Sequence, residues 1–132
     1  MALNNKLVRA LEEEEFDIER FEYQLNSATE INVTLDVVTL NFITDNKLNS
    51  LMRKLRKQPD NLKLLACINK LVKIVQKSPL QPNEWEAQNI AFDIKNELLD
   101  QYQEKSKAGD KEAEEWVQTF KDLASKLNLV IK

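Results

Sequence analysis

Apolar residues recur every three or four positions along most of the chain, which is the spacing of one face of an α-helix. The first such stretch predicts one long helix over residues 3–27, although Glu14 stands where an apolar residue is due. The acidic run 12–15 is then either a solvated turn of that helix or a bend in it. Residues 28–34 are predicted as a connector, with Thr34 as the N-cap of the next helix.

The middle of the chain predicts two further helices on either side of Pro59. One runs from residue 35 to about 56, and its broad apolar arc predicts a central place in the core for Val37, Val38, Leu40, Phe42, Ile43, Leu48, Leu51, Met52 and Leu55. Proline disfavours a helical residue before it, so Asp60 is predicted as the N-cap of a helix over 61–77. That helix has the cleanest separation of apolar and lysine-rich faces in the sequence.

The last third of the sequence predicts two more helices and a tail. Asn83 is predicted to cap a helix that ends near Gly109, because glycine favours the left-handed conformation that closes a helix. Asp110 is predicted to cap a fifth helix with a strongly periodic apolar face. Residues 129–131 are too short and too β-branched to extend it, and are predicted as an extended tail on the bundle.

The predicted fold is therefore all-α, an antiparallel bundle of about five helices, because short connectors favour antiparallel neighbours. Residues 1–132 are enough for a single domain. One glycine and three prolines provide too few tight turns for a sheet-rich fold.

Composition removes most catalytic chemistry from consideration. The absence of histidine excludes Ser-His and Cys-His mechanisms and the Glu-x-x-His sites of di-metal bundles. The single cysteine, Cys67, lies among apolar neighbours and is interpreted as a small buried residue rather than a nucleophile. The carboxylates cluster along single helices, whereas a glycosidase needs two that face each other across a cleft. We expect no catalytic residue, metal or cofactor in this chain.

Charge is unevenly distributed, and this raises the question of nucleic-acid binding. Residues 47–78 carry nine basic residues and one acidic residue, whereas both flanking segments are acidic. These bases either form a phosphate-binding face or lie beside the acidic neighbouring helices. The basic segment lacks interleaved aromatic residues that stack on bases, so nucleic acid is not the expected partner. No apolar segment is long enough for a membrane span, and the cytoplasm is the expected compartment.

One segment carries a candidate binding surface. Trp85, Gln88, Asn89 and Phe92 are spaced three, four and seven residues apart, so they share one helix face. A tryptophan beside two carboxamides can stack on a sugar ring and bind its hydroxyls. The alternative is structural, with Trp85 packed under the proline connector and the carboxamides bonded to loop carbonyls.

Two motifs together resemble a known family. The first comprises Pro82, Trp85, Ala87, Gln88, Asn89 and Phe92, and the second comprises Gly109, Asp110, Glu112, Ala113, Trp116 and Phe120. In this order they resemble the C-terminal helical region of bacterial proteins related to glycoside hydrolase family fifty-seven, often labelled alpha-amylase or alpha-mannosidase. The likeness covers roughly residues 31–131.

The resemblance implies that this chain is a non-catalytic helical domain of a retaining alpha-glycosidase. The nucleophile and acid of such an enzyme lie on an N-terminal barrel outside this chain, and the helical domain packs beside it. Met1 then starts a C-terminal fragment, and Trp85, Gln88 and Asn89 are the candidate contacts to an alpha-glycan. The alternative is a free-standing helical module for protein interaction or dimerisation, which would need no catalytic domain.

Overall fold

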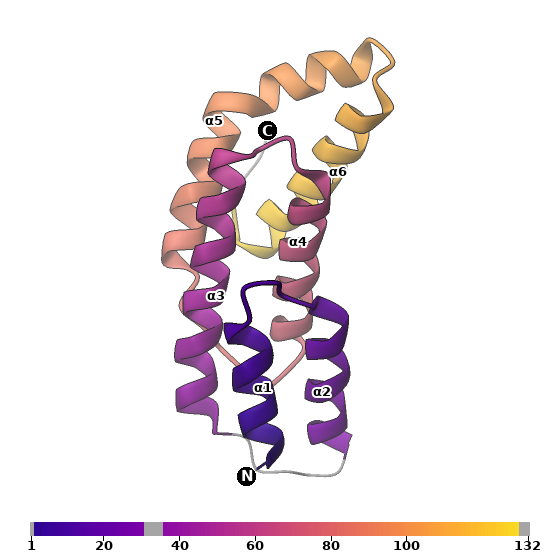
Figure 1. The fold of residues 1–132 in the computed structure, drawn as a ribbon. Helices are drawn as coiled ribbons and strands as arrows, with labels where there is room; N and C mark the ends of the chain where they lie inside the picture. Colours follow the sequence, from indigo (N-terminus) through magenta and orange to yellow (C-terminus); the bar gives the residue numbers. More distant parts are fainter. Residues whose placement is uncertain (1, 31–35, 130–132) are drawn as a thin grey trace.

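A computed structural model describes residues 2–30 and 36–129, and the described chain is all-α with no strand. Figure 1 shows the helices as a bundle in which successive helices run in opposite directions. The six helices are α1 (Ala2–Glu12), α2 (Ile18–Glu30), α3 (Val37–Lys57), α4 (Leu62–Gln76), α5 (Trp85–Lys107) and α6 (Lys111–Lys126). The predicted fold class is confirmed, with one helix more than expected.

The architecture is built from three helical hairpins, with α3 and α4 in the middle. α1 and α2 pack on one side of this central pair, where α1 contacts α3 and α2 contacts α4. α5 and α6 pack on the other side, where α5 contacts α3 and α6 contacts α4. Figure 1 also shows α5 bending along its length, so that its C-terminal half leans over the turn between α3 and α4.

The long helix predicted over residues 3–27 is wrong, because the acidic run breaks it into two. α1 ends at Glu12, and the Oδ1 atom of Asp17 begins α2 by accepting the backbone N–H groups of Glu19 and Arg20, both at 3.1 Å. The Lys47 ammonium group of α3 holds the turn by donating to the Glu13 carbonyl at 2.8 Å. The break lets α2 fold back beside α1 instead of extending away from the core.

The connector predicted over residues 28–34 is also wrong in part. Residues 28–30 belong to α2, whereas the predicted N-cap Thr34 lies outside the described residues. The observed N-cap of α3 is Asp36, whose side chain accepts the N–H of Thr39 at 3.2 Å. Asp36 is a good cap for the same reason as threonine, because its short side chain reaches an unpaired amide of the first turn.

The other helix ends are close to their predicted positions. Asn61, one residue after the predicted cap Asp60, accepts the N–H of Leu64 at 3.1 Å to begin α4. α6 begins at the predicted cap, Asp110, which accepts the N–H of Ala113 at 3.1 Å. Gly109 has a φ of +101° and closes α5 as expected.

The C-terminal end of α6 uses the same geometry with an asparagine. Asn128 has a φ of 63°, and the N–H of Leu129 donates back to the Ala124 carbonyl at 2.8 Å. Leu129 is thereby packed against the core. The remainder of the predicted extended tail, residues 130 and 131, lies outside the described residues.

The core runs through all three hairpins and consists of aliphatic side chains with a few aromatic ones. Its largest fully buried side chains are Trp116, Phe21, Phe120, Leu7, Leu11, Leu25, Leu40, Leu48, Met52, Leu55, Leu65 and Ile68. The apolar faces predicted for α4 and α6 are confirmed in most positions. Along α5, Leu99 is buried whereas Leu98 and Tyr102 are only partly buried. The buried face of this helix therefore shifts along its length, as the helix bends.

Candidate functional site

The candidate residues Trp85, Gln88 and Asn89 occupy the first two turns of α5. The predicted cap Asn83 lies one residue before the observed cap position, Glu84, and its side chain still accepts the N–H of Trp85 at 2.9 Å. This bond satisfies an amide that the first turn of a helix leaves unpaired. The side chain of Glu84 makes no capping bond.

The three candidate residues do not act together. Trp85 is 68% exposed, and Asn89 is exposed beside it. Gln88 instead donates its Nε2 to the Leu127 carbonyl at 2.8 Å and so fastens the end of α6 to α5. The structural alternative is therefore right for Gln88, whereas packing of Trp85 under the proline connector is wrong.

α3 adds two large apolar side chains to the exposed surface. The sequence placed Val38 and Phe42 in the core, but they are 82% and 67% exposed. Phe92 of α5, two turns from Trp85, is 49% exposed. We call Val38, Phe42, Trp85 and Phe92 the α3–α5 apolar surface.

The place where α5 begins explains why Val38 and Phe42 are uncovered. Arg53 pairs with Glu86 at 2.6 Å, and Arg56 pairs with Asp93 at 2.9 Å, so the two arginines mark the side of α3 that faces α5. A repeat of 3.6 residues puts positions 42 and 38 on that same side of α3, about three and five turns before the arginines. α5 begins too far along α3 to cover them.

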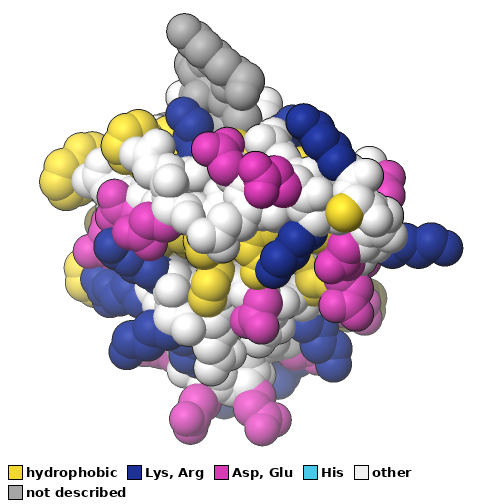
Figure 2. Space-filling view, turned by 90° about the horizontal axis from the view of Figure 1, so that it is seen from above, with side chains coloured by type: hydrophobic (Ala, Val, Ile, Leu, Met, Phe, Trp, Pro, Cys, Tyr) yellow, Lys and Arg dark blue, Asp and Glu magenta, His cyan; other side chains and the backbone are white. Residues whose placement is uncertain are grey.

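Ion pairs among the described residues engage three of the nine bases in the middle segment, namely Arg53, Arg56 and Lys70. Arg56 reaches a second acid, Glu97, at 3.6 Å, and Lys70 of α4 pairs with Glu22 of α2 at 3.6 Å. Seen from the end of the molecule in Figure 2, basic and acidic side chains alternate rather than gather into one field. This arrangement fits solvated bases beside acidic helices better than a phosphate-binding face.

Two titratable groups with shifted pKa values, Cys67 and Lys47, lie close enough to interact electrostatically. Burial raises the pKa of the Cys67 thiol, which disfavours the nucleophilic thiolate. Burial also lowers the pKa of Lys47, whose ammonium group is engaged with the Glu13 carbonyl and lies 5.1 Å from the centre of the Phe16 ring. Among residues 2–30 and 36–129, no group of His, Cys, Asp and Glu side chains is arranged to hold a metal ion.

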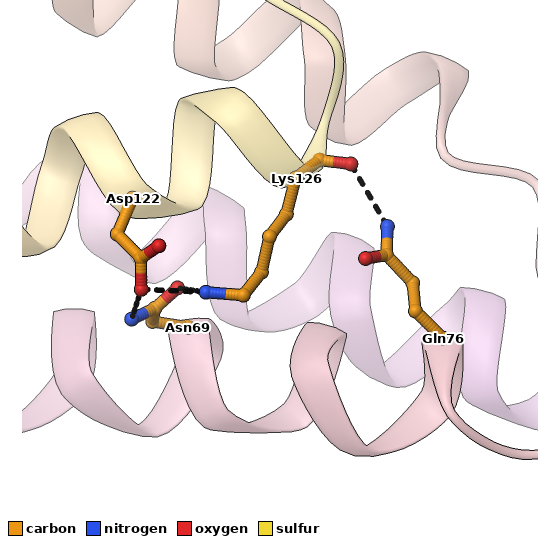
Figure 3. A network of polar contacts seen from close by, with 4 residues as sticks. All are labelled: Asn69, Gln76, Asp122 and Lys126. Carbon is orange, nitrogen blue, oxygen red and sulfur yellow. Dashed lines mark hydrogen bonds and ion pairs between the residues drawn. The ribbon is translucent and has the colours of Figure 1, made fainter.

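A solvent-facing groove lies on another side of the molecule, where α2 and α6 flank α4. Its volume is about 510 Å³, within the range of small-molecule sites. Figure 3 shows the polar network at its α6 wall: Asp122 accepts the Lys126 ammonium group at 2.6 Å and the Asn69 amide at 2.9 Å. Gln76 donates to the Lys126 carbonyl at 2.8 Å, so the network joins α4 to α6.

This network predicts an acid-sensitive contribution to stability. Hydrogen bonds from Lys126 and Asn69 hold the pKa of Asp122 below its ordinary value of 3.8. A carboxylate whose pKa is lower in the folded chain than in the unfolded chain stabilises the fold at pH values above its pKa in the unfolded chain. This stabilisation is lost as the pH falls through its pKa in the folded chain. Asp122→Asn is expected to cost about 0.5 kcal/mol at pH 7, a small figure because the pair is exposed and screened.

Urea unfolding at pH 7, 5 and 3 measures this effect. The difference between wild type and Asp122→Asn should persist from pH 7 to 5 and shrink below 3.8. Asp100→Asn, an exposed position on α5, serves as the control with the same charge change. A difference that stayed constant down to the lowest pH would contradict the role of the Asp122 carboxylate.

Sequence reasoning did not identify the groove or its network. Asp122 and Lys126 have the four-residue spacing of a helix ion pair, but Asn69 lies on another helix about 50 residues away, and nothing in the local sequence connects it to them. Comparison of this chain with protein-family models, curated proteins and solved structures finds no match. Among the helices of the described residues, none combines the length and apolarity needed to cross a membrane.

Proposed function

We propose that this chain is a non-catalytic helical domain that packs against a larger catalytic domain through the α3–α5 apolar surface. The observation that carries the proposal is the exposure of Val38, Phe42, Trp85 and Phe92 on two neighbouring helices. Large apolar side chains left exposed on a protein surface favour contact with another macromolecule, and aromatic ones contribute most to such contacts. Among the described residues, no group of His, Cys, Asp and Glu side chains could hold a metal ion.

The resemblance to family-fifty-seven-related proteins supports a specific partner. On this proposal the partner is the N-terminal catalytic barrel of a cytoplasmic bacterial alpha-glycosidase. Trp85 and Asn89 are exposed on one face of α5, so both are available at the edge of a glycan cleft. Gln88 contributes indirectly, because its bond to the Leu127 carbonyl fixes the face that carries them.

The first test is the reading frame upstream of Met1. Codons for a barrel with catalytic Glu and Asp residues support the proposal, and the barrel can then be produced as a separate polypeptide. The 132-residue chain should bind it, and Phe42→Ser combined with Trp85→Ser should weaken binding at least about tenfold, because aromatic anchors dominate interface energies. Isothermal titration calorimetry measures both affinities.

Tyr23→Ser is the matched control for this experiment. Tyr23 is 74% exposed but lies on α2, in the hairpin on the other side of the central pair, so its loss should leave binding unchanged. In the assembled complex, malto-oligosaccharide should change the fluorescence of Trp85, whereas the buried Trp116 provides a constant background. A stop codon just before Met1, or wild-type binding by the double variant, would exclude the proposal.

The same surface also supports the free-standing alternative, in which the chain dimerises or binds another protein. Light scattering at high protein concentration distinguishes the two. A dimer that is lost in the Phe42→Ser, Trp85→Ser variant favours the free-standing module, and a strict monomer favours a dedicated partner domain.

A further inference from the structure

The groove between α2, α4 and α6 has the construction of a small-molecule site, and it lies apart from the α3–α5 apolar surface. In the described part of the chain, α2 and α6 both contact α4 but do not contact each other, so one stripe of α4 forms an open floor. The lining residues that matter for binding are Glu22, Asn26, Thr29, Lys73, Lys77 and Asp122.

Two lysines of this groove form no ion pair with the described acidic residues of its walls, although Lys73 is close enough to Asp122 to help lower the pKa of that carboxyl. Of the two acidic residues on the walls, Glu22 pairs with Lys70 at 3.6 Å, and Asp122 is engaged by Lys126 at 2.6 Å. Lys73 and Lys77 are exposed, and neither forms an ion pair within 4.0 Å among the described residues. Lys73 lies in the last turn of α4 and Lys77 is its C-cap, so their Cβ atoms lie about 5–6 Å apart and both ammonium groups can reach one anion.

The kinds of side chain in the groove indicate which anion fits. Lysine binds phosphate as a point charge, whereas planar carboxylates are better matched by arginine, and no arginine lines the groove. No aromatic residue lines it either, so it offers no platform for a nucleobase. Asn26 and Thr29 line the α2 wall, where the Asn26 amide can donate to or accept from hydroxyl groups of a ligand. The Thr29 hydroxyl donates to the Leu25 carbonyl at 3.0 Å, so its oxygen can accept a hydrogen bond from the ligand.

We propose that the α2–α4–α6 groove binds a small phosphorylated polyol, with its phosphate on Lys73 and Lys77 and its hydroxyl groups on Asn26 and Thr29. The volume of about 510 Å³ accommodates such a molecule. The two lysines also lie at the C-terminal end of α4, where any cation offsets the helix dipole. If the two lysines only offset the helix dipole, they would need no groove and would show no selectivity for phosphate. Experiment can therefore distinguish phosphate binding from a role in helix stability.

Calorimetric titration of the full chain with fructose 6-phosphate at constant ionic strength tests the proposal. We expect saturable binding with one site, and a loss of affinity of about tenfold or more in Lys73→Gln combined with Lys77→Gln, because two charged contacts are removed. Lys107→Gln with Lys111→Gln makes the same charge change at the exposed turn between α5 and α6, and should alter affinity less than about twofold.

Two further comparisons complete the test. Glu22→Gln removes an acidic wall residue and should tighten binding, whereas Glu114→Gln on exposed α6 should not. Inorganic phosphate should bind more weakly than fructose 6-phosphate, because it lacks the hydroxyl groups that meet Asn26 and Thr29. Absence of saturable binding at 10 mM ligand, which means a binding free energy weaker than about −2.7 kcal/mol, would overturn the site. An equal loss of affinity in the two double-lysine variants would overturn it as well. Equal affinity for the two probes would overturn the hydroxyl contacts.

Discussion

Ile68→Asp is expected to abolish the cooperative unfolding transition of this domain. Ile68 is fully buried in α4, and α4 packs against α2, α3 and α6. A carboxylate at this position has no partner and must be desolvated or protonated, which costs several kcal/mol. The whole free energy of unfolding of a domain this size is about 5–15 kcal/mol. Circular dichroism during urea titration should therefore show no native baseline.

Ala66→Asp is the matched control for this substitution. Ala66 lies on the same helix but is exposed on the groove side of α4, so the same new charge remains in water. Its cost should stay below about 1 kcal/mol, most of it from the lower helix propensity of aspartate. An Ile68→Asp protein that melts like the wild type would show that another face of α4 is buried.

Periodicity predicted the buried faces well where a helix has neighbours along its whole length. α4 and α6 lie in the middle and at the side of the bundle, and Ile68, Val72, Trp116 and Phe120 are all buried as their spacing indicates. Helix ends were also predictable where a short side chain caps an amide or a glycine allows a positive φ. Asp110 and Gly109 illustrate both cases, because their roles depend only on local geometry.

Prediction failed where the outcome depends on distant parts of the chain. Val38 and Phe42 have the same apolar spacing as their buried neighbours, and only the position at which α5 begins leaves them exposed. The break after Glu12 is fixed partly by Lys47, which reaches the turn from a different helix. No window of local sequence contains either relation.

The candidate site was affected by the same limitation. Spacing placed Trp85 and Asn89 on one helix face, but it could not show that both are exposed, or that Gln88 is bonded to the carbonyl at the end of α6. The groove between α2, α4 and α6 was not foreseen because its lining comes from three helices. Lys73 and Lys77 looked like an ordinary solvated face of α4, and only the packing of α2 beside them encloses a volume there.

The second large effect concerns Trp116 of α6, which contacts both α5 and the turn between α3 and α4. Its ring stacks on Tyr102 with centroids 4.0 Å apart and on Phe120 with centroids 4.9 Å apart. Its indole N–H donates to the Pro59 carbonyl at 2.6 Å, which fastens α6 to the turn between α3 and α4. The side chain is 1% exposed, so these contacts are made away from water.

Trp116→Ala is expected to lower the free energy of unfolding by about 3–5 kcal/mol, because it leaves a large cavity in the core. Trp116→Phe keeps most of the ring but leaves the Pro59 carbonyl without its donor, and should cost about 1–3 kcal/mol. The other tryptophan is a control within the same chain. Trp85 is 68% exposed, so Trp85→Ala should change stability by no more than about 0.5 kcal/mol. Equal losses from the two alanine variants would mean that Trp85, too, is part of the core, and the α3–α5 apolar surface would no longer be available for a partner.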